Sequence, residues 1–255
     1  MYQDPKFRDS INKFTGIVRR CIEDYRMIED GESIAVGVSG GKDSVALLCA
    51  LANLRRFYPK RFELHAVTLD MGFEGMDFSP IEKLCKGLDV PYTLRHKELG
   101  QILFEERHEK NPCSLCAKMR RGVIHDIITE LGIKKLALAH NFDDAVETFL
   151  LSLLYEGRLN CFQPVTYMSR TDITQIRPMI YIGEGTVIKL IEKCGLPVVH
   201  NLCPMNGVSK RQEVKMLLKT LGASYPDLKN RIFGAMQRLP LEGWGRAAQS
   251  AADEN

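Results

Sequence analysis

The sequence predicts an α/β fold, a doubly wound parallel sheet with helical extensions at both ends. Three observations support this class. Short apolar runs alternate with segments of helical periodicity between residues 33 and 155. A glycine-rich turn joins the first apolar run to the helical segment that follows it. The chain has 255 residues, 45% of them hydrophobic, which suffices for one large domain with small appendages.

The expected elements follow one another in a regular order. Apolar side chains recur every three or four positions over residues 7–28, which predicts the first helix. The α/β part then contains strand 33–38, helix 43–57, strand 62–69, helix 79–88, strand 91–95, helix 99–106, helix 117–131, strand 135–139 and helix 142–155. After residue 156 the pattern is less regular and predicts strand 174–177, helix 184–194 and helices 208–221 and 226–237. The predicted parts are an N-terminal helical segment (1–30), an α/β domain (31–200), a helical extension (201–242) and a flexible tail (243–255).

Composition favours a cytoplasmic protein and leaves a polyanionic partner open. No apolar run reaches the length of about 18 residues that a membrane helix needs, and the N-terminus lacks a signal-peptide pattern. The eight cysteines are not arranged as in a small secreted scaffold. Net charge is only +3, but the basic residues are clustered. Such clusters attract nucleic acid when they share a face, although each one alone is also typical of a solvated helix surface.

The glycine-rich turn predicts a phosphate-binding loop. It reads Ser39, Gly40, Gly41, Lys42, Asp43, Ser44. The two glycines let backbone N–H groups close around phosphate oxygens, the serines add hydroxyl donors, and Lys42 adds a charge at a helix N-terminus. The spacing is not that of a Walker A motif, which predicts a different ATP chemistry. The alternative is a glycine turn with a purely structural role.

Acidic residues are expected at the same edge of the sheet. His140, Asp143, Asp144 and Glu147 follow strand 135–139, and Asp70 follows strand 62–69. Because ligands of such sheets bind beyond the carboxyl ends of the strands, the carboxylates can face a triphosphate and hold Mg²⁺. His140 is a candidate contact for phosphate or substrate. The alternative for the carboxylates is an N-capping aspartate in an acidic first turn.

Three cysteines have the spacing of a metal centre. Cys113 and Cys116 form a CxxC turn before a basic helix, and His200 and Cys203 form an HxxC turn far downstream. Three alternatives stay open. Spacing alone favours a structural Cys₃His zinc site with His200, and a redox CxxC at a helix N-terminus is a second option. The third is a three-cysteine [4Fe–4S] cluster with one iron open to a ligand.

Residues 39–44 resemble SGGxDS, the signature of PP-loop ATP pyrophosphatases, which cleave ATP between its α and β phosphates. More broadly, residues 15 to about 220 resemble the tRNA 2-thiocytidine synthetase (TtcA) family. The matching stretches are 39–44, 113–116 with 120–122, 140–148, 155–159, 176–178 and 201–203. The chain departs from the family at Asn141, which replaces a histidine, and at His200, which replaces a cysteine that the cluster does not need. The resemblance implies an adenine nucleotide alpha hydrolase-like fold.

The resemblance also implies a reaction. A cytidine at tRNA position 32 would be adenylylated on its C2 oxygen, and sulfide held by a [4Fe–4S] cluster on Cys113, Cys116 and Cys203 would displace AMP. The implied catalytic residues are Lys42, Asp43 and Asp144, with Mg²⁺ on the two aspartates. Expected ATP contacts are residues 39–44 with Asp70, His140 and Asp143.

The expected partner is tRNA. Candidate contacts are Lys118, Arg120, Arg121, Arg158, Lys210 and Arg211. A sulfur donor such as a cysteine desulfurase is a second expected partner, and the sequence leaves a homodimer open. A tRNA 2-thiouridine synthetase and a lysidine synthetase are the alternative enzymes. A nucleotide-binding module with a structural zinc site is the alternative of another class.

Overall fold

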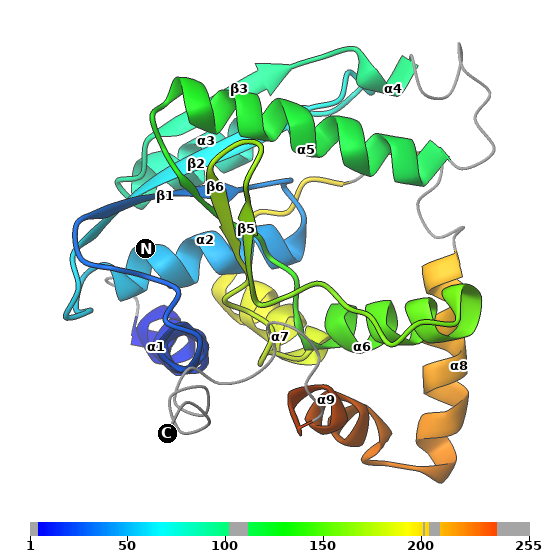
Figure 1. Ribbon diagram of the computed structural model, residues 1–255. Coiled ribbons are helices and arrows are strands. Elements are labelled where there is room, and N and C mark those ends of the chain that lie inside the picture. The colour runs from blue at the N-terminus through cyan, green and yellow to red at the C-terminus, as the bar shows by residue number, and fades with distance from the viewer. Residues whose placement is uncertain (1–4, 102–111, 201, 204–209, 239–255) are drawn as a thin grey trace.

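Six strands form one sheet in the order β3-β2-β1-β4-β6-β5 (Figure 1). The computed structural model describes residues 5–101, 112–200, 202–203 and 210–238. The strands are β1 (Glu32–Gly37), β2 (Phe62–Asp70), β3 (Tyr92–His96), β4 (Lys135–Ala137), β5 (Val165–Met168) and β6 (Ile173–Ile176). All neighbouring pairs are parallel except β5 with β6, which is antiparallel. The predicted α/β class is confirmed, and the antiparallel edge strand β5 was missed.

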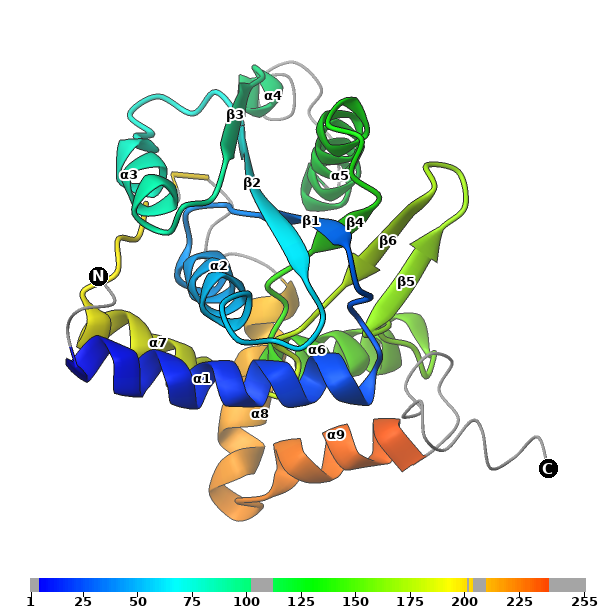
Figure 2. The same ribbon diagram turned by 90° about the vertical axis from the view of Figure 1, so that its left-hand side faces the viewer.

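Helices cover both faces of this sheet (Figure 2). The described helices are α1 (Pro5–Asp24), α2 (Lys42–Leu54), α3 (Ser79–Gly87), α4 (Leu99–Gln101), α5 (Pro112–Glu130), α6 (Phe142–Leu151), α7 (Glu184–Cys194), α8 (Lys210–Ser224) and α9 (Leu228–Arg238). Alternation in β1 explains the two layers: Ile34 and Val36 join the core formed with α1, α2 and α7, whereas Ala35 packs with Ile127 and Ile128 of α5. α2 is buried from Ser44 to Leu54, as its nearly continuous apolar sequence requires.

Several boundaries differ from those predicted. α5 begins at Pro112 rather than at residue 117, so the CxxC segment is the first helical turn and not a turn before the helix. A proline suits that first position because its missing N–H needs no partner there. The predicted helix 142–155 ends as α6 at Leu151 and continues as a π-helical turn (Ser152–Glu156). Parts of the predicted helices 99–106 and 208–221, and the predicted tail 243–255, lie outside the described residues.

The carboxyl ends of the central strands lie together. Gly37 at the end of β1 is in register with Val67 of β2, and Val36 is in register with Ala137 of β4. The β1–α2 loop and the β4–α6 loop therefore leave the sheet at the same edge, with α5 above them. Among the described helices, none is both long and apolar enough to cross a membrane.

Candidate active site

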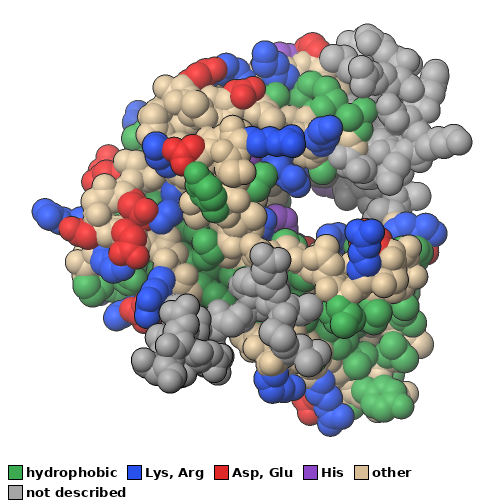
Figure 3. Space-filling view, viewed as in Figure 1, with side chains coloured by type: hydrophobic (Ala, Val, Ile, Leu, Met, Phe, Trp, Pro, Cys, Tyr) green, Lys and Arg blue, Asp and Glu red, His purple; other side chains and the backbone are tan. Residues whose placement is uncertain are grey.

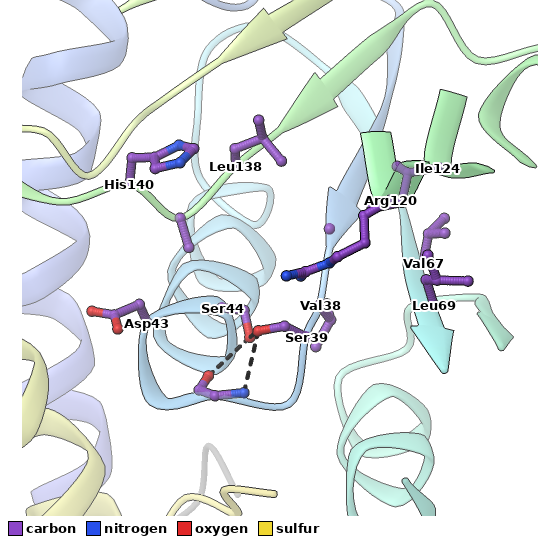
Figure 4. A pocket seen from close by; sticks show the side chains of 13 residues that line it. Val38, Ser39, Asp43, Ser44, Val67, Leu69, Arg120, Ile124, Leu138 and His140 are labelled. Carbon is purple, nitrogen blue, oxygen red and sulfur yellow. Dashed lines mark hydrogen bonds between the residues drawn. The ribbon is translucent and has the colours of Figure 1, made fainter. Parts of the chain in front are cut away.

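A cavity of about 270 Å³ lies over the carboxyl ends of β1, β2 and β4 (Figure 4). The β1–α2 loop forms its floor through Ser39, Gly41, Asp43 and Ser44. Apolar side chains form much of the remaining wall, and they are Val38, Val67, Leu69, Ile124 and Leu138. His140 and Arg120 complete it from β4 and α5 respectively. A polar floor under an apolar wall fits a nucleotide, with phosphates on the loop and a base against the wall.

The loop has a backbone that only glycine fits. Gly40 has φ of +84°, and a Cβ built on it would lie 2.8 Å from Cβ of Val199. The N–H of Val199 donates a hydrogen bond of 2.9 Å to the carbonyl of Gly40, which fastens the loop to the segment just before Cys203. Inside the loop, the Ser44 hydroxyl donates to the Gly41 carbonyl at 2.8 Å. These bonds fix the shape of the loop, and its binding of phosphate stays a prediction.

Lys42 is held by two carboxylates at the start of α2. Its Nζ lies 2.8 Å from Asp43 and 3.1 Å from Glu184. Burial lowers the pKa of Lys42, but the hydrogen bonds to these carboxylates outweigh burial and hold the pKa above its ordinary value. Glu184 also binds Lys215 at 2.7 Å. The lysine is therefore charged and oriented at the rim of the phosphate loop.

Asn141 connects the two carboxylates that were predicted to hold magnesium. Its side-chain amide donates to Asp43 at 2.9 Å, while its backbone N–H donates to Asp144 at 2.9 Å. The backbone N–H of Asp144 donates a hydrogen bond of 3.0 Å to Oδ1 of Asn141. Together these two bonds between Asn141 and Asp144 form a capping box at the start of α6. Burial raises the pKa of Asp144, and the charge on Asp43 adds to the rise. This pair of hard oxygen ligands fits Mg²⁺ chemistry beside phosphates.

Sequence reasoning missed the importance of Asn141, which it treated only as a departure from the family pattern. The signal was available, since asparagine three residues before an acidic residue is a helix-start pattern. Because Asn141 both caps α6 and bonds Asp43, it sets the relative position of the two aspartates. The predicted acidic turn and the predicted phosphate loop are thus directly joined.

Asp143 and Asp70 are engaged elsewhere. The Asp143 carboxylate accepts from Nζ of Lys229 and from the backbone N–H of Glu184, the latter at 2.7 Å. Asp70 accepts from the Gly72 N–H at 3.0 Å and lies 2.9 Å from Nδ1 of His96. Neither aspartate is among the residues that line the cavity. Both aspartates therefore bind other groups of the protein. The structure does not place them in the cavity where ATP contacts were predicted.

His140 is neutral in a basic environment. Its ring lies 4.8 Å from that of Phe162, and its buried Nδ1 has no hydrogen-bond partner among the described residues. Burial, together with the charges of Arg177, Arg211 and Arg121, lowers the pKa of His140 to about 3. The imidazole can donate or accept a hydrogen bond at the cavity wall, but it does not carry a positive charge near neutral pH.

A second cavity, of about 230 Å³, adjoins the first and holds two of the predicted metal ligands. Cys116 reaches it from α5, and Cys203 reaches it from the segment after α7. Its apolar wall consists of Leu69, Met71, Phe73, Met76, Phe78 and Val199. The side chain of Cys113 lies outside the described part of the chain, and His200 is described but does not line this cavity. Two thiols in an apolar cavity are suitable donors for a soft metal or an iron–sulfur cluster.

The predicted tRNA contacts divide between three places. Lys118, Arg120 and Arg121 are all exposed on α5, and Arg120 also lines both cavities. Lys210 binds Glu213 at 3.0 Å, and Arg211 binds Glu147 at 3.3 Å and lies 3.8 Å from Asp144. Exposed Arg158 follows the π-helical turn. Figure 3 shows a hollow between the part that carries α5 and the part that carries α6 and α8, with Lys and Arg side chains on both sides.

Known proteins resemble the chain over most of its length. The family model of the PP-loop domain matches residues 10–201. The tRNA-cytidine(32) 2-sulfurtransferase of Syntrophotalea carbinolica is 39% identical over 237 residues, which are 92% of this chain and 90% of that protein. The protein of the same name from Geobacter sulfurreducens is 36% identical over 91% of this chain and 92% of its own.

A solved structure shares the fold. The U34-tRNA thiolase NcsA from Methanococcus maripaludis, determined with its [4Fe–4S] cluster, has a TM-score of 0.74 and 24% identity. The match covers 91% of this chain and 79% of that one, and at this identity it shows the fold alone. The family match and the two relatives, at 39% and 36% identity over nine tenths of this chain, show the family. The chain therefore belongs to the PP-loop family and, within it, to the tRNA-cytidine(32) 2-sulfurtransferases.

Proposed function

We propose that this protein is an ATP-dependent tRNA sulfurtransferase that replaces the C2 oxygen of a cytidine at tRNA position 32 with sulfur. One observation carries the proposal beyond the family match. The nucleotide cavity and the cysteine cavity share four lining residues, Ser39, Gly41, Leu69 and Arg120. A base activated in the first cavity therefore adjoins sulfur delivered from the second.

The chemistry follows from the need for a leaving group. The C2 oxygen of cytosine attacks the α-phosphorus of ATP, a P–O bond forms, and pyrophosphate leaves. Hydrosulfide then adds to C2, the C2–O bond breaks, AMP departs with the original oxygen, and the remaining proton passes to solvent. The loop N–H groups and Lys42 stabilise charge that develops on the phosphates. Asp43 and Asp144 would hold Mg²⁺ against the same oxygens.

The cysteines would hold the cofactor that handles sulfur. Cys113, Cys116 and Cys203 provide three thiolates, which suits a [4Fe–4S] cluster with one iron left open. When bound, such a cluster supplies a soft site for sulfide, so no protein thiol is consumed. Apolar side chains form most of the cavity around Cys116 and Cys203.

Basic residues around the hollow provide the surface for the anticodon loop. Lys118, Arg121 and Arg158 are exposed, and the structure records no ion pair for any of them among its described residues. Their charges are therefore available to tRNA phosphates. A cytoplasmic location and a cysteine desulfurase as sulfur donor belong to the same proposal.

Product analysis tests this function. Anaerobic protein with reconstituted cluster is incubated with unmodified tRNA, sulfide, lysine and ATP labelled on the α-phosphate. We expect AMP, pyrophosphate and 2-thiocytidine, with the nucleoside identified by mass spectrometry. ADP and phosphate as products would contradict the PP-loop chemistry. 2-Thiouridine or lysidine in place of 2-thiocytidine would establish one of the alternative enzymes.

Metal analysis tests the cofactor separately. We expect about four irons per chain after anaerobic reconstitution. Cys116→Ser and Cys203→Ser should lose iron, whereas Cys85→Ser, a change at a thiol buried in α3, is the matched control that should retain it. Stoichiometric zinc without iron, released by His200→Ala, would instead support the module with a structural zinc site.

A further inference from the structure

Arg120 lines both cavities, whereas the nearby basic residues Lys118 and Arg121 line neither of them. It lines the nucleotide cavity together with Ser39 and Ser44, and it lines the second cavity together with Cys116 and Cys203. Figure 4 shows its side chain extending from α5 toward Ser39 and Ser44, with His140 on the far side. In the described part of the chain no ion pair or hydrogen bond engages its guanidinium. An arginine without a carboxylate partner, in a cavity floored by a phosphate loop, indicates an anionic ligand.

The chemistry of the proposed reaction determines which phosphate lies beside the cysteines. In the activated base, C2 is separated from the α-phosphorus by a single oxygen. The sulfur that attacks C2 must therefore come within a few ångströms of the α-phosphate, whereas the β and γ phosphates have no such requirement. Consequently, the α-phosphate must lie where the two cavities meet. Of the four residues that line both cavities, Arg120 alone carries a charge.

We propose that Arg120 is a catalytic residue that binds the α-phosphate of ATP, first in the nucleotide complex and then in the adenylylated base. The contact with the adenylylated base rests on the proposed function. The contact with ATP does not, because binding of the nucleotide needs no tRNA. A planar guanidinium can donate two hydrogen bonds to two phosphate oxygens, so it stabilises charge during attack and again as AMP departs. Arg120 is thereby distinguished from Lys118 and Arg121, with which the sequence grouped it as a tRNA contact.

Helical geometry agrees with this division. Lys118 and Arg121 are three residues apart and share one face of α5, whereas Arg120 is offset from that face. α5 packs on β2, so one side of the helix is directed at the sheet edge where the loop lies. Ile124, one turn after Arg120, lines the nucleotide cavity as well. The two residues mark the side of α5 that faces the nucleotide.

The direct test measures nucleotide binding without tRNA. Affinity for α,β-methylene ATP is determined by calorimetry for the wild type, Arg120→Gln and Arg120→Lys. We expect Arg120→Gln to bind about ten- to one-hundred-fold more weakly, the usual effect of losing a charge-assisted hydrogen bond. The affinity of Arg120→Lys should lie between those of the wild type and Arg120→Gln. Lysine keeps the charge but cannot donate two parallel hydrogen bonds as a guanidinium does. Lys189→Gln, which removes an exposed cation on α7, is the control with unchanged affinity.

A second measurement separates this role from a tRNA contact. Arg120→Gln should bind tRNA with wild-type affinity and wild-type salt dependence, whereas Arg121→Gln should show weaker tRNA binding and a smaller salt slope. Wild-type nucleotide affinity in Arg120→Gln, with weakened tRNA binding, would overturn the inference. Circular dichroism of each variant confirms folding. If the wild type forms no thiolated tRNA, the proposed function fails, but the nucleotide result still decides the contact of Arg120.

Discussion

Lysine and arginine residues around the active site fall into two groups with different partners. Lys42, Lys215, Lys229 and Arg211 each bind at least one carboxylate, and most of these contacts join helices that are distant in sequence. Across the cavity, Lys118, Arg120 and Arg121 of α5 form no ion pair with any described residue. The first group is committed to the protein, and the second is available to ligands.

This difference in ion pairing gives the cavity one side that is fixed by ion pairs and one side whose charges can bind a ligand. Paired cations fix Asp43, Asp143 and Glu184 around the loop, so the phosphate side is organised before ATP arrives. The α5 side keeps its charges unneutralised, which preserves the positive potential that attracts a polyanion. Substitutions on the two sides should therefore have different effects. Two experiments examine this contrast, and a third examines the neutral histidine of the same cavity.

The largest effect is expected on the organised side. Asp43→Asn removes the carboxylate that binds Lys42 and Asn141 and that would hold Mg²⁺. We expect formation of AMP from ATP in the presence of tRNA to fall by at least about one-hundred-fold, because phosphate positioning is lost. Affinity for tRNA should remain at the wild-type level. Glu192→Gln on the exposed face of α7 is the control, and a turnover in Asp43→Asn equal to that of this control would disprove the assignment.

On the receptive side the expected change concerns affinity. The double variant Lys118→Ala and Arg121→Ala should bind tRNA more weakly and reduce the slope of log affinity against log salt by about 1.4 to 1.8, the value for two phosphates. Binding of ATP should not change. The double variant Lys189→Ala and Lys193→Ala removes the same charge from α7 and should leave the slope intact. Equal slopes in both double variants would show that α5 does not contact tRNA.

The smallest effect concerns the pH dependence of stability. Since the pKa of His140 is about 3 in the folded protein and about 6.5 when unfolded, only the unfolded chain takes up this proton between those values. Stability should therefore fall as pH decreases from 6.5, with a contribution from His140 of at most about 1.4 kcal/mol per pH unit. His140→Phe should flatten this acid-side loss in urea unfolding measured from pH 7 to pH 5. A wild-type slope in the variant would mean that the imidazole is not held neutral.

Local patterns in the sequence predicted most of the fold and the floor of the site. The strand–turn–helix at residues 33–44 and the acidic turn after β4 both depend on neighbouring residues, and both were found where expected. β5 was missed because four residues with exposed Tyr167 at the sheet edge have little apolar alternation. Its strand conformation depends on pairing with β6.

Long-range packing explains what the sequence could not reveal. Arg211 was predicted to contact tRNA, yet its carboxylate partner Glu147 lies 64 residues away in the chain. Lys229 reaches Asp143 across 86 residues. Helical periodicity showed that Arg120 was offset from its neighbours, but only the packing of α5 on β2 shows that the offset directs it into the cavity. Pairing of charges and orientation of helices arise from tertiary structure, which spacing does not encode.

The bond between Gly40 and Val199 has a thermodynamic consequence. The carbonyl of Gly40 accepts a hydrogen bond from the N–H of Val199, and Val199 and Cys203 line one cavity. Where a ligand on the loop changes the affinity of a ligand at Cys203 through this bond, linkage makes the influence reciprocal. Any factor by which ATP altered retention of a metal centre at the cysteines would equal the factor by which that centre altered affinity for ATP. This equality would hold for the two cavities before any tRNA is present.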